Sequence, residues 1–154
     1  MISISAQAAG DFIVDWNDAA LDTVRSERLG AAPASRLYAL TNAAVYDAVN
    51  GIDVAQGRSD RPSLLVSVKQ APRKASRAAA AAAAAHAVLS AVSPARATEF
   101  DTLLAVHLSA LGRGRRVRAG RAWGEYVGSA AVAARADDGT QIQEILPAGT
   151  APGV

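Results

Sequence analysis

Histidine and cysteine, which often act as acid–base groups or nucleophiles near neutral pH, are scarce in this chain. Its 154 residues include two histidines and no cysteine, which excludes disulfides, thiol catalysis and cysteine-ligated metals. His107 falls on an apolar stripe of helical spacing with Phe100 and Leu104, whereas His86 stands apart from such a stripe. Neither has a carboxylate at ligand spacing or an evident catalytic partner nearby in the sequence. We therefore interpret both as structural residues rather than as metal ligands or acid–base groups.

A basic cluster covers residues 113–121, with the sequence RGRRVRAGR. Guanidinium groups match phosphate oxygens, so the cluster could bind an anionic polymer. However, no aromatic residue interleaves with it before Trp123, and the formal charge of the whole chain is only +2. We interpret it as the solvated start of a helix and expect no nucleic-acid partner. Because arginines are unfavourable at the positive end of a helix dipole, a loop is predicted up to about Gly114.

Tyr38, Asn42, Tyr46 and Asn50 recur every four residues beside an apolar helical stripe. Asparagine is unfavourable inside a helix because its side chain competes for backbone hydrogen bonds. Two interpretations are open for this Tyr/Asn flank. It is either a solvated helix face or a surface that contacts another part of a larger protein.

Gly120, Gly124 and Gly128 are also spaced by four and form one ridge on a predicted helix. Each glycine costs a helix about 1 kcal/mol relative to alanine, so three in line need a structural reason. Charged residues interrupt the segment, which excludes a membrane dimerisation motif. The ridge predicts close approach of another helix within the chain, with a subunit contact as the alternative.

No motif of known catalytic chemistry is present. The chain has no phosphate-binding glycine loop with lysine, no nucleophile elbow and no helical pair of metal ligands. We therefore assign no catalytic, cofactor-binding or metal-binding residue.

Hydrophobic periodicity predicts an all-α fold of about five helices in a partial bundle. The first is expected to start near Asp15 as its cap, and the second to run from Pro33 to a stop at Gly51. A loop or arm follows over residues 52–73, where a short strand at 64–68 is rejected for want of a partner strand. The remaining helices are predicted at about 75–92, which includes the alanine run 78–85, from Ser93-Pro94 to Leu111, and at about 115–136 before Gly139.

The domain organisation follows from these elements. Residues 1–14 are expected to be a tail, 15–139 a helical domain, and 140–154 a truncated linker. The small residues of Ala6-Gln7-Ala8 have the form of a signal-peptidase site, but no adequate apolar stretch precedes them. We therefore interpret the segment as a frayed terminus, with the end of an export signal as the alternative. No run approaches the roughly 18 apolar residues of a membrane span, and a soluble chain is expected.

Several patches resemble the vanadium-dependent haloperoxidases, a branch of the type 2 phosphatidic acid phosphatase superfamily. The most specific is AAVYDAVN at residues 43–50; the others are Asp15-Trp16-Asn17, His86-Ala87-Val88-Leu89, Phe100-Asp101 and RADDG at 135–139. The resemblance spans nearly the whole chain. It implies an all-α protein whose helical bundle binds vanadate and oxidises a halide with hydrogen peroxide, or, in the phosphatase branch, binds phosphate.

The oxyanion-binding motifs of that family are missing here. The resemblance implies that the oxyanion is held by a Lys-x6-Arg-Pro motif, a Ser-Gly-His motif and an Arg-x5-His-type motif. The chain's Arg61-Pro62 has Val54, not lysine, seven positions before the arginine, no Ser-Gly-His occurs, and neither histidine has the required arginine context. The resemblance therefore implies an N-terminal scaffold that is inactive alone, with vanadate belonging to the full-length parent. Its expected partner is the C-terminal catalytic bundle of the same protein, with a homo-oligomer also open. The alternatives are a free-standing helical interaction module and a phosphatase parent.

Overall fold

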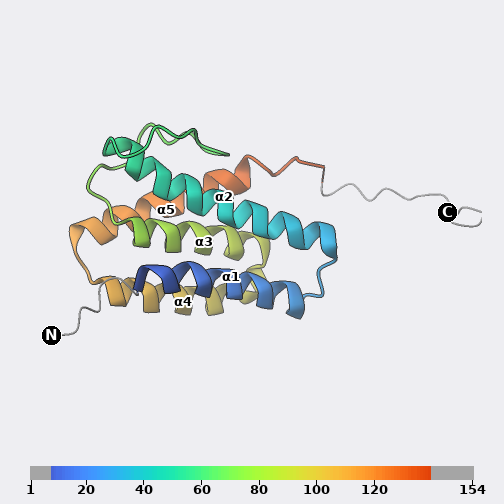
Figure 1. Cartoon of the computed structure of the whole chain (residues 1–154). Helices are drawn as coiled ribbons and strands as arrows, with labels where there is room; N and C mark the ends of the chain where they lie inside the picture. Colours follow the sequence, from blue (N-terminus) through green and yellow to red (C-terminus); the bar gives the residue numbers. More distant parts are fainter. Residues whose placement is uncertain (1–7, 140–154) are drawn as a thin grey trace, which may run out of the picture.

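A computed structural model describes residues 8–139, with side chains from Phe12 onward, and shows them as five packed helices without a strand (Figure 1). This confirms the predicted all-α fold. The helices are α1 (Ala8–Ser26), α2 (Ala31–Ala55), α3 (Arg77–Val92), α4 (Ala97–Leu111) and α5 (Arg115–Ala133), with a short 3-10 turn, η1 (Pro94–Arg96), before α4.

Helix α3 is the centre of the molecule and contacts each of the other four helices (Figure 1). It separates one hydrophobic cluster, formed mainly with α2 and α5, from another formed mainly with α1 and α4. The seven alanines from Ala79 to Ala85 are all buried. Alanine favours the helix and lets neighbours approach closely, so the low-complexity run forms the core of this bundle. Ser76 caps the helix by accepting a hydrogen bond from the backbone N–H of Ala79 at 3.3 Å.

The glycine ridge of α5 packs against the backbone of α3, which confirms the predicted internal helix contact. A Cβ atom on Gly120 would lie 2.3 Å from the carbonyl oxygen of Ser76, and one on Gly124 would lie 2.2 Å from that of Ala80. On Gly128 it would lie 2.7 Å from the carbonyl oxygen of Ala84. The matched spacing on both helices shows that α3 and α5 run parallel in direct backbone contact.

Three predicted helix boundaries were wrong. Helix α1 begins at Ala8 rather than near Asp15, so residues 8–14 are helical and Asp15 is not a cap. Helix α2 continues through Gly51 to Ala55. Gly51 is a packing residue, because a Cβ atom there would lie 2.9 Å from Val68 Cβ and 3.0 Å from Trp123 Cζ2. The loop therefore begins at residue 56, and α5 ends at Ala133 with turns rather than helix to residue 136.

The long connection between α2 and α3 is held by a buried carboxylate. Asp47 is fully buried in α2, and its two oxygens accept hydrogen bonds from the backbone N–H groups of Leu64, Leu65 and Val66 at 2.7 to 2.8 Å. No described strand lies beside this segment to pair with these groups. The rejection of a strand at residues 64–68 is confirmed, and Asp47 supplies the bonds that a partner strand would have made.

None of the described helices combines the length and hydropathy that crossing a bilayer requires. The predicted linker at 140–154 and most of the Ala6-Gln7-Ala8 site lie outside the described residues.

Candidate functional site

The Tyr/Asn flank of α2 is largely occupied by the chain itself. Asn50 Nδ2 donates to the carbonyl oxygen of Arg61 at 3.0 Å, and Asn50 Oδ1 accepts from the hydroxyl of Ser59 at 2.7 Å. The Tyr46 hydroxyl donates to the carbonyl oxygen of Pro62 at 3.3 Å. The C-terminal half of the flank therefore anchors the loop that follows α2, a role that helical spacing alone did not reveal.

The N-terminal half of the flank contacts α1. Asn42 is exposed, and its Nδ2 donates both to Asn17 Oδ1 at 3.1 Å and to the carbonyl oxygen of Tyr38 at 3.0 Å. No described residue donates to Asn42 Oδ1, so this oxygen can accept a bond from solvent or from another molecule. Tyr38 is half-buried against the cluster of α1, α3 and α4.

A groove of about 660 Å³ opens between the flank, the start of α1 and the loop after α2. Val45, Val49 and Ile13 give it an apolar part, and the Ile13 side chain on its rim is 44% exposed. Charged residues close one end, where Asp53 pairs with Arg58 at 2.6 Å. This groove has the mixture of apolar and hydrogen-bonding groups expected of a surface that receives another helix.

Both histidines have carboxylate partners, contrary to what their sequence neighbours indicated. His107 Nε2 lies 2.9 Å from Asp15 Oδ2 and joins α4 to α1. His86 Nε2 lies 2.7 Å from Asp101 Oδ1 and joins α3 to α4. Each partner is remote in sequence or on another helix, so local spacing carried no signal of either pair.

Trp16 lies between the two histidines. Its ring stands edge-on to His107 at 5.8 Å and to His86 at 6.2 Å between centroids, and Phe12 covers His107 at 4.3 Å. The Nδ1 atom of His107 and the Nε1 atom of Trp16 are buried without a hydrogen-bond partner among the described residues. The His107 ring is only 2% exposed, so its contact with Asp15 joins α4 to α1 in a place that a ligand cannot readily reach.

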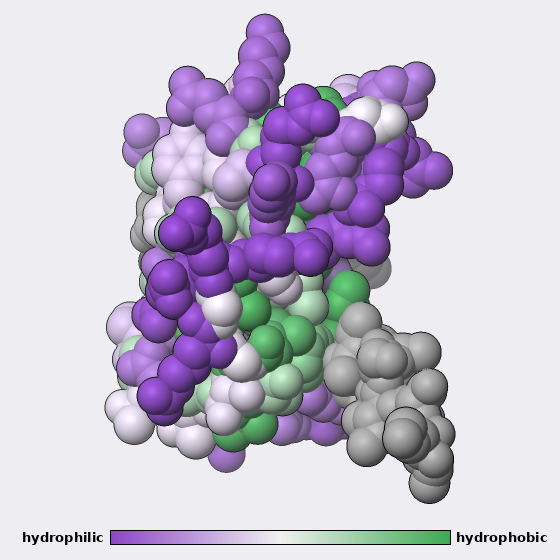
Figure 2. Space-filling view, turned by 90° about the vertical axis from the view of Figure 1, so that its left-hand side faces the viewer, coloured by the Kyte–Doolittle hydropathy of each residue, from purple (hydrophilic) through white to green (hydrophobic). Residues whose placement is uncertain are grey.

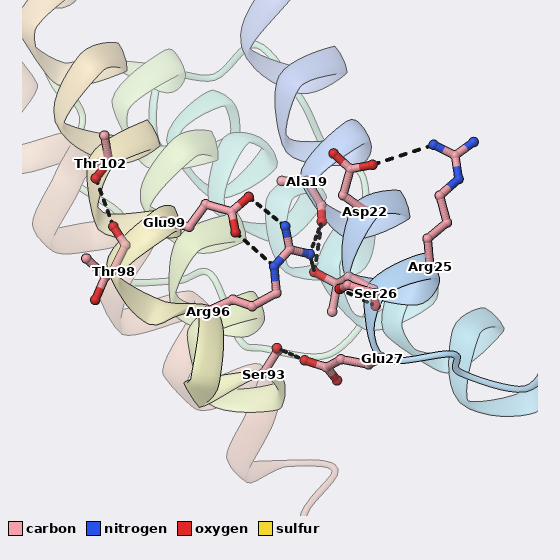
Figure 3. A network of polar contacts seen from close by, with 11 residues as sticks. Ala19, Asp22, Arg25, Ser26, Glu27, Ser93, Arg96, Thr98, Glu99 and Thr102 are labelled. Carbon is pink, nitrogen blue, oxygen red and sulfur yellow. Dashed lines mark hydrogen bonds and ion pairs between the residues drawn. The ribbon is translucent and has the colours of Figure 1, made fainter.

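A polar network joins the end of α1 to the start of α4 (Figure 3). The guanidinium of Arg96 binds both oxygens of Glu99 at 2.6 and 2.9 Å and donates to the hydroxyl of Thr23 at 2.7 Å. The Ser93 hydroxyl donates to the Glu27 carboxylate. Thr23 is buried, and its hydroxyl also bonds the carbonyl oxygen of Ala19. The polar groups of this network bond one another, and these bonds connect the end of α1 to the start of α4.

The two histidines are not placed to hold vanadate. An oxyanion needs convergent cationic or N–H donors, but each histidine Nε2 already faces a carboxylate, which repels anions. No group of three or more His, Asp or Glu side chains within residues 12–139 is arranged to hold a metal ion.

The basic cluster is solvent-exposed around a helix start, as predicted. Helix α5 begins at Arg115, directly after the extended Gly114, and Arg113, Arg116 and Arg118 are exposed.

Comparisons of the chain with protein-family models, with curated proteins and with solved structures found no match.

Proposed function

We propose that this chain is a helical scaffold, the N-terminal part of a protein resembling the vanadium-dependent haloperoxidases. The groove beside the Tyr/Asn flank receives a helix from the catalytic bundle of that parent. Vanadate and the residues that hold it belong to the catalytic bundle, and the scaffold contributes shape and rigidity.

The single observation that supports this proposal is the open groove along α2, in the segment that carries the most specific family likeness. Val45, Tyr46 and Val49 belong to the AAVYDAVN patch and also line the groove. The patch thus coincides with an accessible surface that combines apolar contacts and an unused acceptor on Asn42.

The decisive experiment compares this chain with the product of the complete open reading frame. Each is purified and assayed for bromide oxidation by hydrogen peroxide with added orthovanadate. We expect vanadate-dependent oxidation by the longer product and none by residues 1–154 alone. A longer product that carries Arg-Pro and Ser-Gly-His motifs but releases phosphate from a phosphomonoester instead would point to the phosphatase branch. A complete reading frame without those motifs would refute the proposal.

A pair of matched variants tests the groove itself. Ile13→Glu places a charge on the groove rim, and its side chain is 44% exposed, so the fold should tolerate it. Val106→Glu introduces the same charge on α4, where the side chain is 60% exposed and lies away from this groove. We expect only Ile13→Glu to lower the thermal stability and activity of the longer protein.

The second candidate is a free-standing interaction module, and a different groove favours it. Helices α1 and α4 enclose about 550 Å³ with Leu103 and Val106 as apolar lining and Asp18, Asp22 and Glu99 among the polar residues. Such a surface suits a basic amphipathic helix. The glycine ridge is buried against α3 and cannot serve this role. If the chain is an interaction module, Val106→Glu should weaken partner binding, and Ile13→Glu should leave it unchanged.

A further inference from the structure

Basic side chains from two separate segments meet at one end of the molecule. Helices α3 and α5 run parallel and start together, and the backbone N–H of Ser76 donates to the carbonyl oxygen of Arg116 at 2.9 Å. The residues just before and after this contact are strongly basic and exposed. They form the basic end: Arg73, Lys74, Arg77, Arg113, Arg115, Arg116 and Arg118.

The charge of the basic end is poorly neutralised. Residues 61–98 contain no aspartate or glutamate, and neither do residues 102–124. Among the side chains that the structure describes, those of residues 12–139, Arg77 is the one member of the set in an ion pair, at 3.3 Å from Asp53. The positive ends of the α3 and α5 dipoles add to the same potential. Figure 2 looks at this end and shows hydrophilic side chains over much of it.

The opposite end of the bundle has a different character. There, Asp22 and Glu99 are ion-paired with Arg25 and Arg96, and the Glu27 carboxylate binds Ser93. The formal charge of +2 therefore conceals a strongly asymmetric distribution along the helix axes. A molecule with such asymmetry turns its basic end toward a negatively charged surface.

We propose that the basic end binds the surface of a bilayer that contains anionic phospholipid headgroups, with the helices standing end-on. Clusters of this size bind anionic lipid surfaces, where each lysine or arginine strengthens the association about fivefold. Binding to a plane needs only a dense group of accessible cations. The basic end, made of helix starts and turns, supplies that density.

Nucleic acid is the poorer fit to the same surface. Residues 69–77 and 112–118 contain no aromatic side chain on which a base could stack. The cations lie at helix starts, so no helix presents its side to a major groove. The contacts available are electrostatic only, which suits headgroups on a plane better than a duplex.

Vesicle sedimentation tests the proposal with the whole chain. The probes are phosphatidylcholine vesicles with and without about one-third phosphatidylserine, a mixture that carries a surface potential of tens of millivolts. We expect binding to the anionic vesicles alone, and loss of it as salt rises from about 0.05 to 0.5 M, because the Debye length falls severalfold.

Two triple variants with equal net charge separate position from charge. Arg113, Arg115 and Arg116 make no side-chain ion pair with a described residue, so changing all three to glutamine should leave the fold intact. The control changes Arg25, Arg28 and Arg135, exposed residues at the other end, to glutamine. The first variant should bind about a hundredfold more weakly and the control less than about threefold more weakly.

Three results would overturn the proposal. The first is an absence of binding to anionic vesicles at low salt by the wild-type chain, with a helical circular dichroism spectrum confirming that it is folded. The second is an equal loss of binding in both variants, which would show that net charge and not the basic end matters. The third is tighter binding to a DNA duplex or single strand with the same arginine dependence, which would assign the surface to nucleic acid.

Discussion

Replacing Gly124 with alanine tests the tightest glycine contact between α3 and α5. The added Cβ would lie 2.2 Å from the carbonyl oxygen of Ala80 and 2.9 Å from Ala83 Cβ. The first contact is with backbone, which no rotamer change can relieve. Helix α5 must therefore move away from α3 by about 1 Å, and a gap of that size loses up to half of each dispersion contact across the interface.

The net effect combines two opposing terms. Forcing the helices apart should cost about 3 kcal/mol, at the upper end of the usual range for overpacking. Alanine returns about 1 kcal/mol because it favours the helix more than glycine does. The expected result is a loss of about 2 kcal/mol in the free energy of unfolding, which lowers the midpoint of thermal unfolding by about 6 °C for a domain of this size.

Urea unfolding followed by far-ultraviolet circular dichroism measures this change. The midpoint should fall without a change in the slope of the transition. The control is Gly114→Ala at the α5 N-cap, where the backbone φ is −66° and nothing lies within 4 Å of an added Cβ. Its free energy of unfolding should fall by less than about 1 kcal/mol, because glycine caps a helix better than alanine does. A Gly124→Ala protein as stable as wild type would refute the close backbone contact between α3 and α5.

Three further substitutions test other parts of the structure. Asp47→Asn removes the carboxylate that accepts from three backbone N–H groups, so it should lower the free energy of unfolding by about 3 kcal/mol. Hydrogen exchange at residues 64–66 should become faster, and unchanged exchange there would contradict the bonding described. His107→Ala leaves a cavity beside Trp16 and should cost about 3 kcal/mol, with a red shift of tryptophan emission; an unshifted spectrum would argue against that contact. Ser76→Ala removes the α3 cap and should cost about 1 kcal/mol in thermal unfolding, whereas no change would mean that the cap bond contributes little.

The sequence predicted the helices well because their signals are local. Ser93-Pro94 marks the break before α4, and the glycine spacing on α5 reports a close contact without naming the partner helix. Gly51 was misjudged because a glycine near a helix end usually stops it. Only the tertiary position of Trp123 and Val68 shows that this glycine is needed for packing.

The polar contacts were much harder to predict. Asp15 and His107 are 92 residues apart, and Asp47 meets backbone groups that carry no side-chain signature. The Tyr/Asn flank was recognised as unusual, but the sequence could not show that Tyr46 and Asn50 bind the chain's own loop. Such contacts depend on how helices are placed relative to one another, which helical periodicity does not determine.

The buried alanine run of α3 has a consequence for how this chain tolerates insertions. Adding or removing one alanine within residues 78–85 leaves the local composition almost unchanged, yet it rotates everything after it by about 100° around the helix axis. His86 would then turn away from Asp101, and Leu89 would leave the core. The alanine run therefore tolerates a change in its length poorly, although its uniform composition suggests the opposite.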